Sequence, residues 1–264
     1  MLHINDLTYR IEGRLILDAA TAAIPDGHKV GLVGRNGAGK TTLLRLLKGE
    51  IAPDDGSIST PRNVRIGHVA QEAPGGDATL IEWVLAADTE RASLLTEAEH
   101  ATDPHRIAEI QIRLTDIDAH SAPARAAQIL SGLGFDEAAQ NRPCRAFSGG
   151  WRMRVALAAI LFLEPEILLL DEPTRGLDVF GSQVIFDYVA HLRGQGKAVI
   201  VSTHQLDEAQ RLCDRFGLMH RGKLVREGNL ESLRAATGFQ SLVEMFLNVA
   251  KVEAANAPAG EVSS

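Results

Sequence analysis

The chain has 264 residues, 45% of them hydrophobic, so it is long enough for one large α/β domain or two smaller lobes with an ample core. Its formal net charge is −7, and no overall positive field indicates a nucleic-acid partner. We therefore expect no direct DNA binding. Cys144 and Cys213 lack partner spacing, which favours a reducing compartment, although two cysteines can in principle pair.

The sequence shows no sign of export or membrane insertion. Its first residues contain no basic stretch followed by an apolar run, so no signal peptide is expected. The longest apolar run, residues 155–163, is too short to cross a bilayer. We expect a cytoplasmic protein that reaches the inner face of a membrane only through a partner.

The first predicted elements are two antiparallel strands over residues 2–9 and 14–24, joined by Glu12-Gly13. Tyr9 lies in the first of them. An aromatic side chain there can stack on a nucleobase, although a tyrosine in a strand more often belongs to the core or its rim.

Residues 34–42 read Gly-Arg-Asn-Gly-Ala-Gly-Lys-Thr-Thr, which fits the phosphate-binding pattern G-x-x-x-x-G-K-[ST]. A short apolar strand at 29–33 precedes the pattern, and a helical pattern at 42–48 follows it. The glycines let the backbone turn tightly, so that successive N–H groups converge on phosphate oxygens. The alternative is a glycine-rich turn without a ligand, but the full motif in this context predicts nucleoside triphosphate binding.

Each side chain of this loop has an expected role. Lys40 is placed to neutralise the β- and γ-phosphates, and the Thr41 hydroxyl to bind Mg²⁺. The helix N-terminus adds its positive end. The expected nucleotide contacts are Gly34, Asn36, Gly37, Gly39, Lys40, Thr41 and Thr42.

The next stretch predicts strands at 57–59 and 64–70, and Gln71 follows the second. A glutamine after a strand is usually polar surface, but here it can reach Mg²⁺ or the attacking water. Residues 75–145 are expected to be helical, with Pro104 and Pro123 as breaks. Their acidic stretch favours a solvated helical hairpin over a charged binding face. No histidine has metal-ligand spacing, so no zinc site is predicted.

A second anion-binding helix terminus is predicted at Phe147-Ser148-Gly149-Gly150-Trp151, before a helix over residues 152–163. Ser148 is suited to cap the helix, and Gly149 and Gly150 leave its first N–H groups bare. A merely structural cap is the alternative.

Two apolar strands are expected to end in reactive side chains. The strand at 167–170 leads into Asp171-Glu172, where Asp171 can hold Mg²⁺ through water and Glu172 can orient or deprotonate water. The strand at 198–203 ends in His204. Ligands gather at the carboxyl ends of parallel strands, so these side chains are candidates for catalysis.

The end of the chain predicts strands at 216–219 and 223–227 and helices at 230–236 and 241–250. We expect a single domain over residues 1–250. Its core comes from 1–74 and 146–230, its helical lobe from about 75–145, and its last helices from 230–250. Residues 251–264, rich in Ala, Pro, Gly and Ser near the end, are expected to form a flexible tail.

Taken in order, these motifs resemble the ATPase domain of the ATP-binding cassette (ABC) superfamily, over residues 2–227. The resemblance implies an α/β P-loop NTPase fold with a mixed or parallel sheet core, N-terminal antiparallel strands and a helical subdomain. It also implies these roles: Tyr9 stacks on adenine, Gln71 is the Q-loop glutamine, Asp171 binds Mg²⁺, Glu172 is the catalytic glutamate, Asp178 is the D-loop aspartate and His204 is the switch histidine. Ser148-Gly149-Gly150 resembles the family signature, with Trp151 where glutamine is commoner.

In that family two domains face each other head to tail, and the signature of one caps the ATP held by the phosphate loop of the other. The resemblance therefore implies an ATPase that uses Mg²⁺ and pairs with a second copy of itself. Attack of water on the γ-phosphate would be organised by Lys40, Gln71, Glu172 and His204.

The finer resemblance divides the chain. Residues 1–174 resemble the first cassette of ABC-F proteins, which are soluble twin-cassette proteins that act on ribosomes. Residues 175–250 resemble ATPase subunits of ABC transporters, because Arg-Gly-Leu-Asp stands at 175–178 where an ABC-F protein usually has Asn-His-Leu-Asp. This division predicts a recombined or engineered chain joined after Thr174; the alternative is a divergent natural cassette.

Three physiological roles remain open from the sequence. The favoured one is the ATPase subunit of a transporter, with a membrane permease as partner. The others are half of a ribosome-associated ABC-F factor and an ATPase module without a physiological partner.

Overall fold

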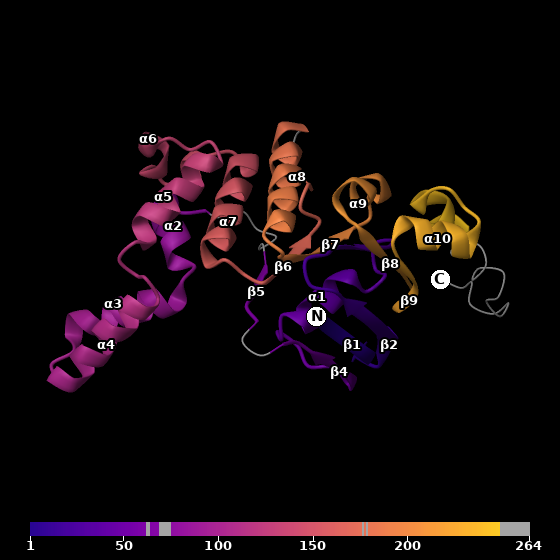
Figure 1. Cartoon of the computed structure of the whole chain (residues 1–264), viewed down its shortest axis with the longest axis horizontal. Helices are drawn as coiled ribbons and strands as arrows, with labels where there is room; N and C mark the ends of the chain where they lie inside the picture. Colours follow the sequence, from indigo (N-terminus) through magenta and orange to yellow (C-terminus); the bar gives the residue numbers. More distant parts are fainter. Residues whose placement is uncertain (62–63, 69–74, 176, 178, 249–264) are drawn as a thin grey trace. The chain divides into compact units, whose positions relative to one another are not determined.

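The computed structural model describes residues 1–61, 64–68, 75–175, 177 and 179–248, and Figure 1 labels their elements. Contacts divide the chain into two compact units. The first comprises residues 1–66, 166–173 and those from 185 onward, and the second comprises 67–165 and 174–184. The second unit begins before the helical lobe expected from residue 75, and the assignment of 1–250 to one domain stays a prediction.

A three-stranded antiparallel sheet with the order β2-β1-β4 opens the first unit. It consists of β1 (Leu2–Ile11), β2 (Arg14–Ile24) and β4 (Asp55–Ser59). The turn Glu12-Gly13 has φ values of 49° and 80°, and positive φ at both positions is the signature of a two-residue type I′ turn. The predicted strand pair is confirmed.

The second sheet has six strands in the order β5-β6-β7-β3-β8-β9. Its members are β3 (Lys29–Val33), β5 (Ile66–His68), β6 (Ile167–Asp171), β7 (Ala198–Thr203), β8 (Arg215–His220) and β9 (Lys223–Gly228). β6, β7, β3 and β8 run parallel, and β9 is antiparallel to β8. Neighbouring parallel strands end at the same edge, so the carboxyl ends of β3, β6 and β7 lie together. This mixed sheet agrees with the predicted fold class.

The helices of the first unit are α1 (Lys40–Leu47), α9 (Leu206–Leu212) and α10 (Leu230–Thr237), and residues 242–248 are also helical. The helix α8 (Val179–Gly194) begins in the second unit and continues into the first. The main core packs the apolar face of α1 against β1, β2 and the mixed sheet. Burial of that face, through Leu43, Leu44, Leu46 and Leu47, holds the start of α1 at the edge of the sheet.

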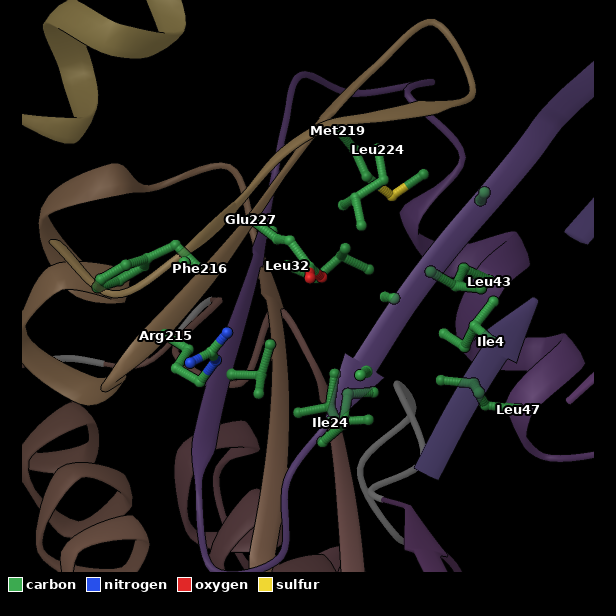
Figure 2. A pocket seen from close by; sticks show the side chains of 17 residues that line it. Ile4, Ile24, Leu32, Leu43, Leu47, Arg215, Phe216, Met219, Leu224 and Glu227 are labelled. Carbon is green, nitrogen blue, oxygen red and sulfur yellow. The ribbon is translucent and has the colours of Figure 1, made fainter. Parts of the chain in front are cut away.

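Figure 2 shows a small apolar cavity in this core, of about 40 Å³. Its walls come from β1, β2, β3, α1, β7, β8 and β9, and the small side chains of Ala20, Ala22 and Ala23 leave the space open. Arg215 and Glu227 are the charged residues among its lining. None of the side chains predicted to bind nucleotide lines this cavity, so we seek the functional site elsewhere.

The second unit is mostly helical, as predicted. It contains α2 (Leu80–Ala86), α3 (Thr89–His100), α4 (Pro104–Asp116), α5 (Ala122–Gly132), α6 (Glu137–Gln140), a 3-10 turn (Cys144–Ala146) and α7 (Gly149–Leu163). Pro104 and Pro123 stand in the first turns of α4 and α5, where a proline without N–H is tolerated.

The pair α3 and α4 forms a hairpin with its own small apolar cluster. Arg106 bonds Glu97 and Glu109, and Arg113 bonds Glu90, all at exposed positions. The acidic side chains are thus partly neutralised within the hairpin, as expected for a solvated face.

Two helix starts were predicted too late. α1 begins at Lys40, two residues before the expected Thr42. α7 begins at Gly149, three residues before the expected Arg152, because Ser148 has the extended backbone of an N-cap and the two glycines adopt helical geometry. Within the part of the chain that the structure describes, no helix is long and apolar enough to cross a membrane.

Candidate nucleotide-binding site

The loop 34–39 connects β3 to α1 and requires glycine for two different reasons. Gly37 has a φ of 78° but nothing within 4 Å of an added Cβ, so only its backbone conformation demands glycine. A Cβ on Gly34 would lie 2.5 Å from the carbonyl oxygen of Met219. Gly34 is therefore required by close packing, and the loop is tight on the side that faces the protein.

Lys40, the first residue of α1, is only 6% exposed. Its Nζ donates to the carbonyl oxygens of Gly34 at 2.8 Å and Arg35 at 3.1 Å. Burial lowers the pKa of Lys40, while the carboxylates of Glu172 and Asp171 act to raise it. The ammonium thus lies under the loop with neutral acceptors, and a phosphate oxygen would be a stronger, charged acceptor.

Thr41 and Asp171 meet at the junction of α1 and β6, where the Thr41 hydroxyl donates to Oδ2 of Asp171 at 2.9 Å. A hydroxyl and a carboxylate are hard oxygen ligands of the kind Mg²⁺ prefers. Among the described residues no three His, Cys, Asp or Glu side chains form a metal cluster. Because Mg²⁺ is usually held by one or two protein oxygens plus substrate phosphates, this pair fits a site that the nucleotide completes.

Glu172 follows β6 with an unusual backbone. Its φ is 47°, a left-handed conformation that is strained for a side chain with Cβ and costs about 1–2 kcal/mol. The N–H of Glu172 donates to the carbonyl oxygen of Ser202 in β7 at 2.8 Å, which holds this bend. Such strain collects at functional sites, where the surrounding structure enforces it.

The carboxylate of Glu172 lies beside the imidazole of His204, with Oε1 of Glu172 2.8 Å from Nδ1 of His204. The Glu172 side chain is 16% exposed and that of His204 is 44% exposed. The pair is therefore open to solvent on the histidine side. The parallel strands β6 and β7 bring together two residues 32 positions apart.

Ser202 is a site residue that sequence reasoning missed. It is fully buried, and its Oγ has no hydrogen-bond partner in the described part of the chain. It stands opposite Asp171 in the register of β6 and β7 and holds Glu172 through its carbonyl. The sequence signal was a hydroxyl residue two positions before His204, in a strand that is apolar up to that residue.

Tyr9 lies in β1 opposite Leu17 of β2 and is half-buried against the main core. A Cβ on Gly39 would lie 2.9 Å from Cδ2 of Leu17. The strand partner of Tyr9 therefore touches the phosphate loop, although adenine stacking stays a prediction. Asn36 of the loop is exposed and Thr42 of α1 is half-buried.

Two predicted site residues, Gln71 and Asp178, lie outside the described residues. The predicted tail of residues 251–264 also lies outside them. The predicted strand over 64–70 is described only in part, as β5. The roles of Gln71 and Asp178 stay predictions.

The predicted signature forms the start of α7. Ser148 is the N-cap, yet its side chain makes no capping hydrogen bond, and both Ser148 and Gly149 are exposed. The Trp151 ring lies 5.1 Å from that of Phe135, and the Arg154 guanidinium stands 4.4 Å above its centroid. These contacts hold the first turn of α7 while its first N–H groups have no side-chain cap.

Comparisons with known proteins agree with this geometry. A model of the ABC transporter family matches residues 17–175. The probable ATP-binding protein YheS of Escherichia coli K12 is 46% identical over 182 residues, which cover 68% of this chain and 29% of that protein. ATP-binding cassette sub-family F member 3 of Homo sapiens is 44% identical over 177 residues, 63% of this chain and 24% of that protein. The chain thus spans less than a third of the length of these relatives.

Solved structures share the fold over nearly the whole chain. The ATP binding subunit of an ABC transporter superposes with a TM-score of 0.76 at 23% identity, covering 95% of this chain and 99% of that one. A nucleotide-free ATP-binding cassette from an ABC transporter gives 0.71 at 20% identity, covering 93% and 98%. These likenesses confirm the predicted P-loop fold of the ABC type.

One relative bears on the predicted junction after Thr174. ATP-binding cassette sub-family F member 2 of Bos taurus is 36% identical over 226 residues, which cover 84% of this chain and 35% of that protein. A match of that length must extend beyond residue 175. The likeness to a sub-family F member therefore continues past the predicted junction, which stays a hypothesis.

Proposed function

This chain belongs to the ABC transporter family, and from that premise we propose that it binds ATP with Mg²⁺ and hydrolyses it to ADP and phosphate. One observation carries the proposal. Lys40, Thr41, Asp171, Glu172 and His204 converge where β3, β6 and β7 end, joined by the Thr41–Asp171 and Glu172–His204 contacts. A cation, two oxygen ligands and a carboxylate–imidazole pair are the groups that phosphoryl transfer to water requires.

The start of α1 binds the phosphates. The loop N–H groups and those at the helix N-terminus donate to phosphate oxygens, and Lys40 exchanges its two carbonyl partners for the β- and γ-phosphates. Thr41 and Asp171 would hold Mg²⁺, which would neutralise charge on the phosphate oxygens. Gln71 would complete this shell from the opposite side.

Glu172 acts on the attacking water. Its carboxylate orients the water and takes its proton as the oxygen bonds to the γ-phosphorus, while the bond from that phosphorus to the ADP oxygen breaks. His204, 2.8 Å from Oε1 of Glu172, holds the carboxylate in place. The strained backbone of Glu172 aims its side chain from the end of β6.

The start of α7 supplies the second half of the site in a second copy of the chain. Ser148, Gly149 and Gly150 present N–H groups without a side-chain cap, which suits the γ-phosphate of an ATP bound to the phosphate loop of the partner. We assign Asp178 to the same interface. Two chains arranged head to tail would thus form two composite sites.

The test is Glu172→Gln, which keeps the shape of the side chain but removes the base. We expect ATP affinity to stay near that of the parent and hydrolysis to fall by about 10²-fold or more. Glu231→Gln, an exposed change in α10, is the control and should hydrolyse ATP at the parent rate. Hydrolysis by Glu172→Gln at the parent rate would refute Glu172 as the base, and a parent that binds no ATP would refute the function.

For the physiological partner, the comparisons favour a ribosome-associated role over the transporter subunit that the sequence favoured. Identities of 46% and 44% link the chain to YheS and to a sub-family F member, whereas the transporter cassettes above are 23% and 20% identical. We expect the protein to sediment from a cytoplasmic lysate with ribosomes. Sedimentation with membranes would support a permease partner instead, and sedimentation with neither would support a module without a partner.

A further inference from the structure

The turn between β8 and β9 closes tightly over two residues, Arg221 and Gly222. Their φ values are 45° and 80°, and His220 pairs with Lys223 across the strands, which defines a type I′ turn. Gly222 is buried although it lies at the tip of a hairpin. Something must therefore cover the turn.

The phosphate loop and β2 cover it. The N–H of Gly222 donates to the carbonyl oxygen of Ala38 at 3.2 Å, and its own carbonyl oxygen accepts from the N–H of Asp18 at 3.0 Å. Strand β8 is also close to the loop two residues before the turn pair, because Met219 presents its carbonyl oxygen 2.5 Å from a Cβ added to Gly34. The hairpin thus contacts both ends of the loop through its backbone.

The packing leaves no room for side chains at these contacts. A Cβ on Gly222 would lie 2.4 Å from the carbonyl oxygen of Ile16, and one on Gly39 would lie 3.0 Å from the same oxygen. At the rim, Lys223 Nζ lies 3.1 Å from Oδ2 of Asp18. Three backbones, those of β2, the turn and the phosphate loop, therefore meet at one point.

We propose that the β8–β9 turn is a positioning element of the phosphate loop, with Gly222 as its key residue. The inference rests on the proposed binding of ATP by that loop. The peptide bond between Ala38 and Gly39 is planar and trans, so its C=O and N–H point in opposite directions. By holding the Ala38 carbonyl, Gly222 aims the Gly39 N–H away from the turn, toward the phosphates.

The chain contains a matched control for this turn. Gly13 is also the second residue of a two-residue type I′ turn and also has a φ of 80°, after Glu12 at 49°. Unlike Gly222, it has nothing within 4 Å of an added Cβ. Gly222→Ala and Gly13→Ala therefore introduce the same backbone strain. Only Gly222→Ala adds a clash with the Ile16 carbonyl, which would move the turn away from β2 and the phosphate loop.

The experiment measures the Kd for Mg-ATP, KM, kcat and thermal unfolding for the parent and both variants. We expect Gly222→Ala to raise Kd and KM about tenfold with kcat largely kept, since small displacements of positioning groups have large effects. Gly13→Ala should bind ATP like the parent. A Gly222→Ala protein that folds and binds ATP as tightly as Gly13→Ala would overturn the inference.

A second measurement on the unaltered protein holds even if Gly222→Ala fails to fold. If the Gly222–Ala38 bond supports ATP binding, ATP must stabilise that bond in return. Saturating Mg-ATP should therefore slow hydrogen exchange of the Gly222 amide but not of the Gly13 amide. If the parent binds ATP and exchange at Gly222 does not change, the role of Gly222 is refuted and the proposed function still stands. If the parent binds no ATP, both are refuted.

Discussion

The starts of α1 and α7 are built alike and equipped differently. A glycine-rich loop precedes α1, and α7 begins with two glycines after Ser148. Neither N-cap, Gly39 or Ser148, makes a side-chain capping bond. Around the start of α1 lie a buried lysine and two acidic residues at the end of β6. Around the start of α7 lie aromatic rings and Arg154, with Ser148 exposed.

The difference indicates that the two helix starts have different roles in ATP binding. A buried cation is costly unless an anion pairs with it, and the nearby carboxylates offset the burial of Lys40 only in part. We therefore interpret the α1 start as a site that holds ATP within one chain. The α7 start offers N–H groups and a rigid aromatic support, which suits a surface that contacts ATP bound to the phosphate loop of a second chain. Three substitutions test this contrast, in decreasing order of expected effect.

Lys40→Met should have the largest effect. It removes the phosphate counter-charge, so we expect ATP affinity to fall about 10²-fold, the order typical of a lost charged contact to a bound anion. Isothermal titration with Mg-ATP measures the loss. Lys48→Met, at the C-terminal end of the same helix, is the control and should bind ATP like the parent.

The same variant should be more stable than the parent at neutral pH. Burial lowers the pKa of Lys40, so the folded state holds this proton less tightly than the unfolded state does. The resulting penalty on folding is present below the lowered pKa and disappears as pH rises through it and up to the ordinary lysine value. The stability gain of Lys40→Met should therefore shrink at alkaline pH; a Lys40→Met protein less stable than the parent at pH 7 would contradict this reading.

Ser148→Arg should act only on assembly. With Mg-ATP we expect the Glu172→Gln single variant to dimerise, because neither copy can hydrolyse the bound ATP. The arginine at the exposed α7 start should leave the protein monomeric with ATP affinity within about twofold, since its phosphate loop is intact. Size-exclusion chromatography with light scattering measures whether each variant is a monomer or a dimer. Ser131→Arg, exposed on α5, should still dimerise; a dimer with Ser148→Arg would place the interface elsewhere.

Trp151→Ala should have the smallest effect. The ring packs edge-on against Phe135 and under Arg154 and is 38% exposed, so its loss should lower the unfolding free energy by about 1–2 kcal/mol. Urea unfolding measures this change, and Trp151→Phe should recover most of it. Monomer ATP affinity should not change. A fall in monomer affinity equal to that of Lys40→Met would abolish the contrast between the two helix starts.

The sequence by itself determined the parts of this protein that depend on local patterns. The phosphate loop, the paired strands around Glu12-Gly13 and the apolar strands before Asp171 and His204 follow from residue spacing and backbone preference within a few positions. These elements were predicted because periodicity and turn chemistry act locally. Even so, the start of α7 was placed three residues late, since a serine followed by two glycines can be a loop as well as a helix start.

The tertiary structure decided the contacts between distant segments. The left-handed backbone of Glu172, its bond to Ser202 and its approach to His204 depend on β6 lying beside β7, which no local pattern specifies. The bond from Gly222 to Ala38 joins residues far apart in the chain, and it exists because β8 lies beside β3 and its hairpin reaches back to the loop. Local patterns show which groups are present, whereas strand order determines which of them meet.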